Sequence, residues 1–201
     1  MAIETPKSLL DFWIGPAKDD PDAAKAKGKL WFTKSFQTDR EIAERFLPTL
    51  SALASGMAYE WAVASPEGRL AAIIGLDQFS RNIFRDTPDA FANDAVAVDL
   101  ATHGILLAVD MEMAEVERQF FYLPLEHSES AADQALCVKA FTGAVRSARE
   151  PFKAHMQDAL DWAVKHKEVI DRFGRFPHRN TILGRVSSPE EDAWIRENGG
   201  F

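Results

Sequence analysis

The stretch SPEGRLAAIIGLDQFSRNIFR, residues 65–85, predicts one long helix whose buried face changes character along its length. Its Ser-Pro-Glu start is typical of a helix N-terminus, because the serine can cap the first turn and proline suits the first helical position. Leu70, Ile73 and Ile74 form an apolar stripe. Steps of three and four residues continue that stripe onto polar side chains, namely Asp77, Gln78, Arg81 and Arg85. Buried charge is costly unless it is paired or used, so this face predicts either an internal Asp77–Arg81 pair that fixes packing or the wall of a pocket.

Apolar residues recur at helical spacing along the rest of the chain, and no strand-like alternation of useful length interrupts them. The spacing and the capping residues predict helices over residues 5–14, 38–56, 57–64, 65–84, 87–104, 112–122, 128–145 and 151–173, and from 188 onward. We therefore expect an all-α protein of seven to nine helices, packed as antiparallel helical hairpins in a single domain that covers residues 1–201.

Some segments of the chain interrupt this pattern. Pro48 should kink or divide its helix, and Pro124 should end the helix that precedes it. The charged segment 18–29 is expected to be solvated, with one helical turn at most. Trp31, Phe32 and Phe36 are expected to be core anchors, because aromatic side chains bury large areas.

Composition and charge exclude several classes of function. The 201 residues contain 23 lysines and arginines against 31 acidic residues, a net charge of −8. An acidic protein is repelled by nucleic acids and by anionic membrane surfaces, so neither is an expected partner. No apolar run reaches the roughly 20 residues of a membrane helix and no secretory signal is visible, so a cytoplasmic location is expected. The single cysteine, Cys137, is expected to be a buried, inert thiol.

One loop departs from the acidic character of the chain. Residues 172–185, RFGRFPHRNTILGR, contain four arginines, one histidine and no acid, and their glycines and proline prevent a long helix. The arginine guanidinium is a planar fork of donors that suits carboxylate and phosphate. The loop therefore predicts an anion site, unless its arginines cap helix C-termini and bond backbone carbonyls as purely structural groups.

Four segments together resemble a known family. They are LDQFSRNIFR at 76–85, YLPLEHSE at 122–129, RFGRFPHRN at 172–180, and LGR at 183–185 followed by SPEE at 188–191. They are similar to the bacterial domain-of-unknown-function family 924, as are LDFW at 10–13 and the Trp31-Phe32 pair. The resemblance implies an all-helical fold of the tetratricopeptide-like superfamily, a right-handed array, although the sequence shows no clean tetratricopeptide repeat. It implies no reaction.

The polar residues of these segments form one site if the segments meet in the fold. The candidate acid–base residues are Glu126, His127 and His178, because imidazole titrates near neutral pH. The candidate ligand-binding residues are Asp77, Gln78, Arg81, Asn82, Arg85, Arg175, Arg179, Asn180 and Arg185. No metal site or cofactor is expected, because no two histidines have the helical spacing of a metalloprotease motif and the arginines would repel a cation. His155 and His166 are interpreted as packing residues.

These observations leave three hypotheses open. In the first, a cationic interhelical pocket binds a small anionic ligand, with or without turning it over. In the second, the helical array is a protein-interaction module whose arginines grip an acidic peptide or a C-terminal carboxylate. In the third, the charged residues only stabilise the fold. Acid–base residues alone do not define a reaction, so the sequence does not decide whether the protein is an enzyme.

Overall fold

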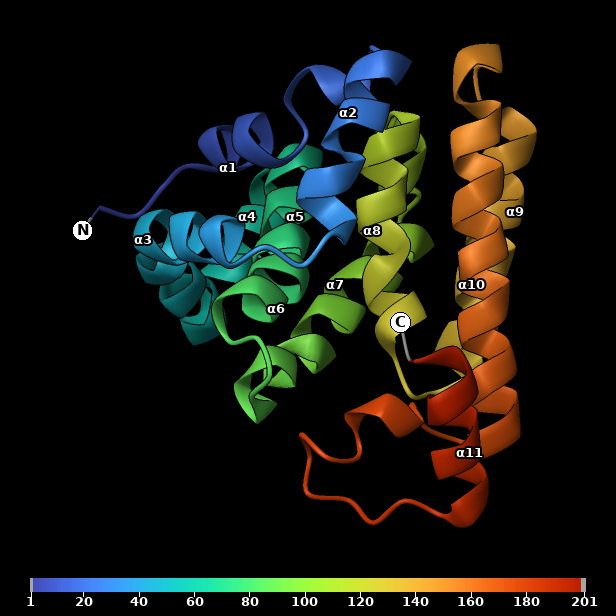
Figure 1. Ribbon diagram of the computed structural model, residues 1–201. Coiled ribbons are helices and arrows are strands. Elements are labelled where there is room, and N and C mark those ends of the chain that lie inside the picture. Colours follow the sequence, from blue (N-terminus) through green and yellow to red (C-terminus); the bar gives the residue numbers. More distant parts are fainter. Residues whose placement is uncertain (1, 200–201) are drawn as a thin grey trace.

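The computed structural model describes residues 2–199, and within that range the chain is helical and contains no β-strand (Figure 1). The α-helices are α1 (Pro6–Trp13), α2 (Pro21–Phe32), α3 (Phe36–Ala52), α4 (Ala58–Ala64), α5 (Pro66–Ile74), α6 (Ser80–Ile83), α7 (Asp94–Leu106), α8 (Glu115–His127), α9 (Ala131–Ser147), α10 (Lys153–Phe173) and α11 (Pro189–Asn198). The π-turn Gly75–Phe79 continues α5 into α6, whereas Gly56, with a φ of 117°, kinks the chain between α3 and α4. With each of these two pairs counted as one, the part of the chain that the structure describes contains nine helices. The all-α prediction and the predicted number of helices are confirmed.

The rod formed by α5 and α6 is the helix that the stretch 65–85 predicted. The Ser65 hydroxyl accepts a hydrogen bond from the Gly68 N–H at 2.9 Å, and the π-turn Gly75–Phe79 continues the helix into α6. Residues 68–80 are all buried, because α5 packs against α1, α4, α7 and α8. A π-turn changes the direction in which successive side chains point and often marks a functional site. Here it carries Asp77 and Gln78.

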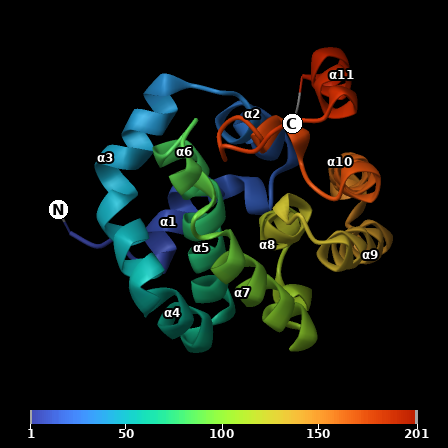
Figure 2. The same cartoon turned by 90° about the horizontal axis from the view of Figure 1, so that it is seen from below.

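The helix α8 lies between the two halves of the molecule, with α5 and α7 on one side and α9 and α10 on the other (Figures 1 and 2). One hydrophobic core extends from Leu9 to Ala163. The Trp13 ring packs edge-on against Phe79 at 5.4 Å and Phe120 at 5.7 Å, which ties α1, the π-turn and α8 together. The right-handed, tetratricopeptide-like arrangement and the single domain over residues 1–201 stay predictions.

The prediction that Pro124 ends a helix was wrong. The helix α8 begins later than expected, at Glu115, and runs through Pro124 to His127. Proline inside a helix removes one hydrogen bond and costs roughly 3 kcal/mol. Between Glu115 and Glu126 only Arg118 is not buried, so burial of this segment against α5, α7, α9 and α10 offsets the cost. Glu126 and His127 consequently lie on the last turn of α8 rather than in a loop.

Other local predictions also fail. The charged segment 18–29 is mostly α2, which Asp20 caps. The helix α3 is capped by Ser35 rather than Thr38, and Pro48 does not divide it. The residues after Thr87 form a 3₁₀ turn, and α7 starts only at Asp94. Phe32 and Phe36 are 59% and 83% exposed, so of the three expected aromatic anchors in this region only Trp31 is buried.

Candidate functional site

A cavity of about 570 Å³ lies between α2, α6, α8 and α10. Its volume falls within the range of about 300–1,000 Å³ that is usual for small-molecule sites. Aromatic, imidazole, amide and charged side chains line it: Trp31, Phe32, Gln78, Arg81, Asn82, Arg85, Gln119, Leu123, Glu126, His127, His155, Asp158, Ala159, Trp162 and His166. The segments 76–85 and 122–129 therefore meet at one cavity, as expected, whereas no residue of the loop 172–185 is part of the wall.

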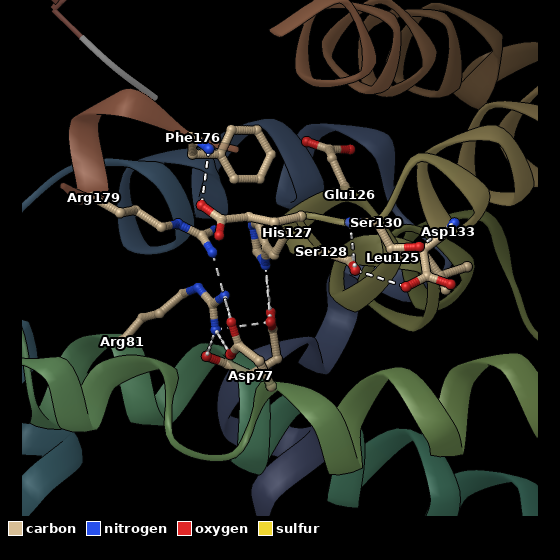
Figure 3. Close-up of polar contacts among 12 residues, drawn as sticks. Asp77, Arg81, Leu125, Glu126, His127, Ser128, Ser130, Asp133, Phe176 and Arg179 are labelled. Carbon is tan, nitrogen blue, oxygen red and sulfur yellow. Dashed lines mark hydrogen bonds and ion pairs between the residues drawn. The ribbon is translucent and has the colours of Figure 1, made fainter. Parts of the chain in front are cut away.

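Asp77 is the buried centre of the polar network beside this cavity, with a side chain only 1% exposed (Figure 3). Its carboxylate pairs with Arg81 at 2.9 Å and accepts a hydrogen bond from the Gln78 amide at 2.6 Å. Arg81 also donates two hydrogen bonds to Asp94, at 2.8 and 2.9 Å. Burial acts to raise the pKa of Asp77, but the charge of Arg81 and the hydrogen bonds outweigh it and hold the pKa well below its usual range. Asp77 is therefore a permanent anion.

His127 reaches the same carboxylate from α8. Its Nδ1 lies 2.8 and 3.0 Å from the two oxygens of Asp77. Burial lowers the pKa of His127, and the attraction of Asp77 does not reverse that shift because Arg81 opposes it. A neutral imidazole that donates from Nδ1 presents Nε2 as an acceptor, so the Asp77–His127 pair has the arrangement of an oriented general base.

Glu126 precedes His127 on α8, and its side chain turns away from the Asp77–Arg81 pair (Figure 3). Its Oε1 lies 3.2 Å from Nδ1 of His166 on α10. That nitrogen also donates to the Trp162 carbonyl at 2.9 Å. Burial lowers the pKa of His166 to about 3, so the contact joins Glu126 to a neutral ring rather than to a cation. Burial, together with the nearby charge of Asp77, raises the pKa of Glu126 to about 8.

The structure places Arg179 behind the Asp77–Arg81 network and not on the cavity wall. Its guanidinium lies between the rings of Phe91 and Phe176, 4.7 and 4.6 Å from their centroids, and 3.8 Å from Asp94. Burial lowers the pKa of Arg179 to about 10. Its charge therefore acts on the network electrostatically, and the aromatic stacking holds it in place.

The other loop residues expected to bind a ligand also lie away from the cavity wall. Arg175 binds Glu191 at 2.6 Å, and Arg185 binds Glu129 at 2.7 Å. The Asn180 amide donates to the Ser187 hydroxyl at 3.0 Å. His178 packs against the Phe176 ring at 5.6 Å, and burial lowers its pKa to about 4. These contacts tie the loop down mainly through ion pairs with glutamates, and only secondarily through the backbone carbonyls of Val186 and Phe176, so the arginines are structural but do not cap helices as the alternative supposed.

Asn82 and Arg85 are on the cavity wall, and both contact Asp39 of α3. Asp39 accepts from Nε and Nη2 of Arg85 at 2.6 Å each. Within residues 2–199 no protein group accepts a hydrogen bond from the third nitrogen, Nη1, so it can donate to a bound molecule.

Sequence reasoning missed the contribution of α10. His155, Ala159, Trp162 and His166 recur at steps of three and four residues and form one face of α10 toward the cavity. The sequence shows that spacing. However, a histidine on an apolar helix face gives the same sequence pattern whether it packs in the core or lines a cavity. The carboxylates that neutralise the arginines, Asp39, Asp94 and Glu129, were also missed because each is distant in sequence from its partner.

A second hollow, of about 440 Å³, lies beside α1. No imidazole contributes to its wall, and its charges come from Lys7, Asp11, Lys18, Glu67 and Glu117. Within residues 2–199, no group of three or more histidine, cysteine or acidic side chains is arranged to hold a metal ion. Of these two hollows, the larger one therefore brings imidazole and carboxyl groups together.

Comparison with known proteins agrees with the fold and adds no activity. A family model described as "Bacterial protein of unknown function (DUF924)" matches residues 9–199. A solved structure of a protein of unknown function from Agrobacterium tumefaciens is similar to this chain with 32% sequence identity and a TM-score of 0.79. The similarity covers 96% of this chain and 97% of that one. A search of curated proteins gave no match.

Proposed function

This chain belongs to the bacterial family of unknown function DUF924, and because that description names no reaction, we propose a function from the site alone. We propose that the protein binds a small organic anion in the cavity between α2, α6, α8 and α10. The observation that carries this proposal is the composition of the wall, where two arginines and three imidazoles lie beside a set of aromatic rings.

The charges at the cavity limit the ligand to an anion of modest charge. Asp77, Asp94 and Asp39 neutralise Arg81 and Arg85, and Asp158 adds a further carboxylate to the wall, so the cavity is not a cationic pocket. Nη1 of Arg85 supplies a donor for a carboxylate, and the nearby rings supply an apolar surface. Trp31, Phe32 and Trp162 suit a flat, apolar body, so the ligand we propose is a carboxylic acid that carries such a body.

The interaction-module hypothesis has less support. It needs loop arginines that can grip a peptide, but Arg175 and Arg185 are engaged by Glu191 and Glu129 of the same chain.

Within residues 2–199 no helix is both long and apolar enough to cross a membrane. We propose that the protein is cytoplasmic and that its ligand is a metabolite. If the protein turns this ligand over, Glu126 and His127 on the cavity wall supply the groups for proton transfer.

Calorimetric titration of the protein with a panel of aromatic and aliphatic carboxylates tests this function. The variant Trp162→Ala removes a ring from the mouth of the cavity, where its side chain is 49% exposed. We expect the wild type to bind an aromatic carboxylate and Trp162→Ala to bind it at least about tenfold more weakly, a loss of roughly 1.4 kcal/mol.

The matched control is Tyr59→Ala, which removes an aromatic side chain of similar exposure, 48%, from α4 and outside the cavity wall. Its affinity should equal that of the wild type. Equal losses in the two variants, or no binding of any carboxylate by a folded wild-type protein, would reject the proposal.

A further inference from the structure

Glu126 is a buried carboxyl group whose hydrogen-bonding capacity is only half used. The residue is 4% exposed, and it is part of the cavity wall. Oε1 contacts His166, whereas Oε2 has no hydrogen-bond partner among residues 2–199. A buried polar atom without a partner is costly, so natural proteins retain one mainly where a water or ligand completes it.

Among residues 2–199, no cation compensates a charge on this carboxyl group. Asp77 of the π-turn raises the pKa of Glu126, and Cys137 of α9 lies close enough for Glu126 to raise the pKa of its thiol in turn. His166 of α10 and His127 of α8 are both kept neutral by burial. From the C-terminal segment, the charge of Arg179 also lowers the pKa of His166, and His178 is itself neutral because burial lowers its pKa to about 4. Ionised Glu126 would therefore face a carboxylate, a thiol and neutral rings, and the protonated form is favoured.

A protonated carboxyl group is a donor. The His166 Nδ1–H group donates to the Trp162 carbonyl, and the same nitrogen lies 3.2 Å from Oε1. Because an N–H group approaches Oε1, we place the carboxyl proton on Oε2, the atom that lacks a partner. Oε2 itself has almost no exposed surface, so a bound molecule with an acceptor oxygen completes the hydrogen bonding of Glu126 once rotation about the last side-chain torsion turns this atom toward the cavity.

We propose that Glu126, as a neutral carboxylic acid, donates its Oε2 proton in a hydrogen bond to a carbonyl oxygen of the ligand. This inference rests on the proposed function and specifies the ligand further. It is an organic acid with its carboxylate toward Arg85, an apolar body against Trp31 and Trp162, and a carbonyl group toward Glu126. Ionisation of Glu126 removes the donor and places a negative charge against the carbonyl oxygen, so affinity falls as the pH rises.

Three probe molecules separate the two ends of the cavity. Para-acetylbenzoate has both the carboxylate and the carbonyl group, para-isopropylbenzoate has the carboxylate without the carbonyl group, and para-methylacetophenone has the carbonyl group without the carboxylate. We expect para-acetylbenzoate to bind most tightly at about pH 6 and about tenfold more weakly at about pH 9, when Glu126 is ionised and Arg179 still carries its charge. The affinity for para-isopropylbenzoate should change much less.

Two variants identify the residue responsible. Glu126→Gln keeps a donor at every pH, so it should bind para-acetylbenzoate with little dependence on pH. Glu117→Gln is the matched control, because Glu117 is on the same helix and also 4% exposed, but it pairs with Lys18 and lies outside the cavity wall. It should retain the wild-type pH dependence. Carbon-13 NMR of the labelled glutamate carboxyl groups should show one signal with a midpoint near 8 that is missing from Glu126→Gln.

The outcomes distinguish this inference from the proposed function. Equal affinities for the two carboxylates at both pH values, or an unchanged pH dependence in Glu126→Gln, would overturn the role of Glu126 and leave anion binding intact. Binding of the neutral ketone alone, with the expected pH dependence, would retain Glu126 and overturn the anionic ligand. If none of the three probes binds, both proposals fail.

Discussion

Asp77 and Glu126 show how two buried carboxyl groups, one beside the cavity and one on its wall, acquire opposite protonation states. Both are almost fully buried, so burial raises the pKa of each. Asp77 has Arg81 at 2.9 Å and accepts hydrogen bonds, and these outweigh burial. Glu126 has a neutral imidazole and a neighbouring anion, so burial prevails. A pair of acids whose pKa values are pushed apart in this way is common at sites of proton transfer.

The variant Asp77→Asn keeps the shape of the side chain and removes its charge. We expect it to lower the free energy of unfolding by about 2–4 kcal/mol, because it leaves the partly buried Arg81 with only one of its two carboxylate partners. Urea unfolding measures the change. Asp11→Asn breaks the exposed Lys7–Asp11 pair instead and should cost less than about 1 kcal/mol. Similar losses in the two variants would show that Asp77 is not the centre of a buried network.

Glu126 also makes stability depend on pH. Its pKa is 4.5 in the unfolded chain and about 8 in the folded protein, so the folded state binds more protons between these values. The stability it contributes is fully present below about pH 4.5 and is lost as the pH rises through about 8. Glu126→Gln removes this dependence, so the variant should gain on the order of a few kcal/mol relative to the wild type across that window. Urea unfolding at several pH values should show the two curves diverging, and parallel curves would contradict the assignment.

At the scale of elements, the close approach of α7 and α8 depends on Gly104. A Cβ atom added there would lie 2.5 Å from the Phe121 ring and 2.9 Å from Arg69. Gly104→Ala should therefore destabilise the protein by about 1–3 kcal/mol through overpacking. The control is Gly143→Ala in α9, where a Cβ atom meets nothing within 4 Å. That change should stabilise the helix by up to about 1 kcal/mol, since alanine has the higher helix propensity. Thermal unfolding of both variants should give shifts of opposite sign.

The existence of the helices could be predicted from local sequence patterns, but some of their first and last residues could not. The run from Leu70 to Ile74 and the Ser65 cap are local signals, and both appear as predicted. Proline 124 is a local signal as well, but the burial of α8 on nearly all sides outweighs it, and that burial involves residues far away in sequence. Phe36 was expected in the core because it is aromatic. It is 83% exposed because it begins α3 on the outside of the bundle, which depends on packing that the sequence does not show.

At the scale of the whole molecule, the cationic loop 172–185 is compensated by acids from elsewhere in the chain. Glu129 follows α8, Glu191 is in α11, and Asp94 begins α7. The sequence shows the concentration of arginines but not their partners, so a loop that is neutralised by long-range pairs was interpreted as an anion site. The convergence of 76–85 with 122–129 was predictable as a hypothesis, whereas the contribution of α10 to the same cavity required the three-dimensional arrangement.

Glu129 connects the C-terminal segment to the turn between α8 and α9. Its carboxylate accepts hydrogen bonds from the Phe176 N–H at 2.8 Å and from Arg185 at 2.7 and 2.9 Å. The variant Glu129→Ala should release residues 174–188 locally while the core stays folded, because these bonds join the segment to the body of the protein. Hydrogen exchange of the Phe176 amide should accelerate by at least about tenfold, and trypsin should cut after Arg185 earlier.

The matched control for this experiment is Glu190→Ala. It breaks the ion pair of Glu190 with Arg172, whose side chains are 64% and 52% exposed, so it removes a charge from the same region without touching the buried contacts. Exposed pairs contribute about 0–1 kcal/mol, and exchange in the segment should change little. The contrary outcome is that the Phe176 amide exchanges at the same slow rate in both variants. That result would show that the segment is held by the packing of Phe176 and the stacked Arg179 rather than by Glu129. In that case the Asp94–Arg179 side of the network, not the turn after α8, would fix the position of the C-terminal segment.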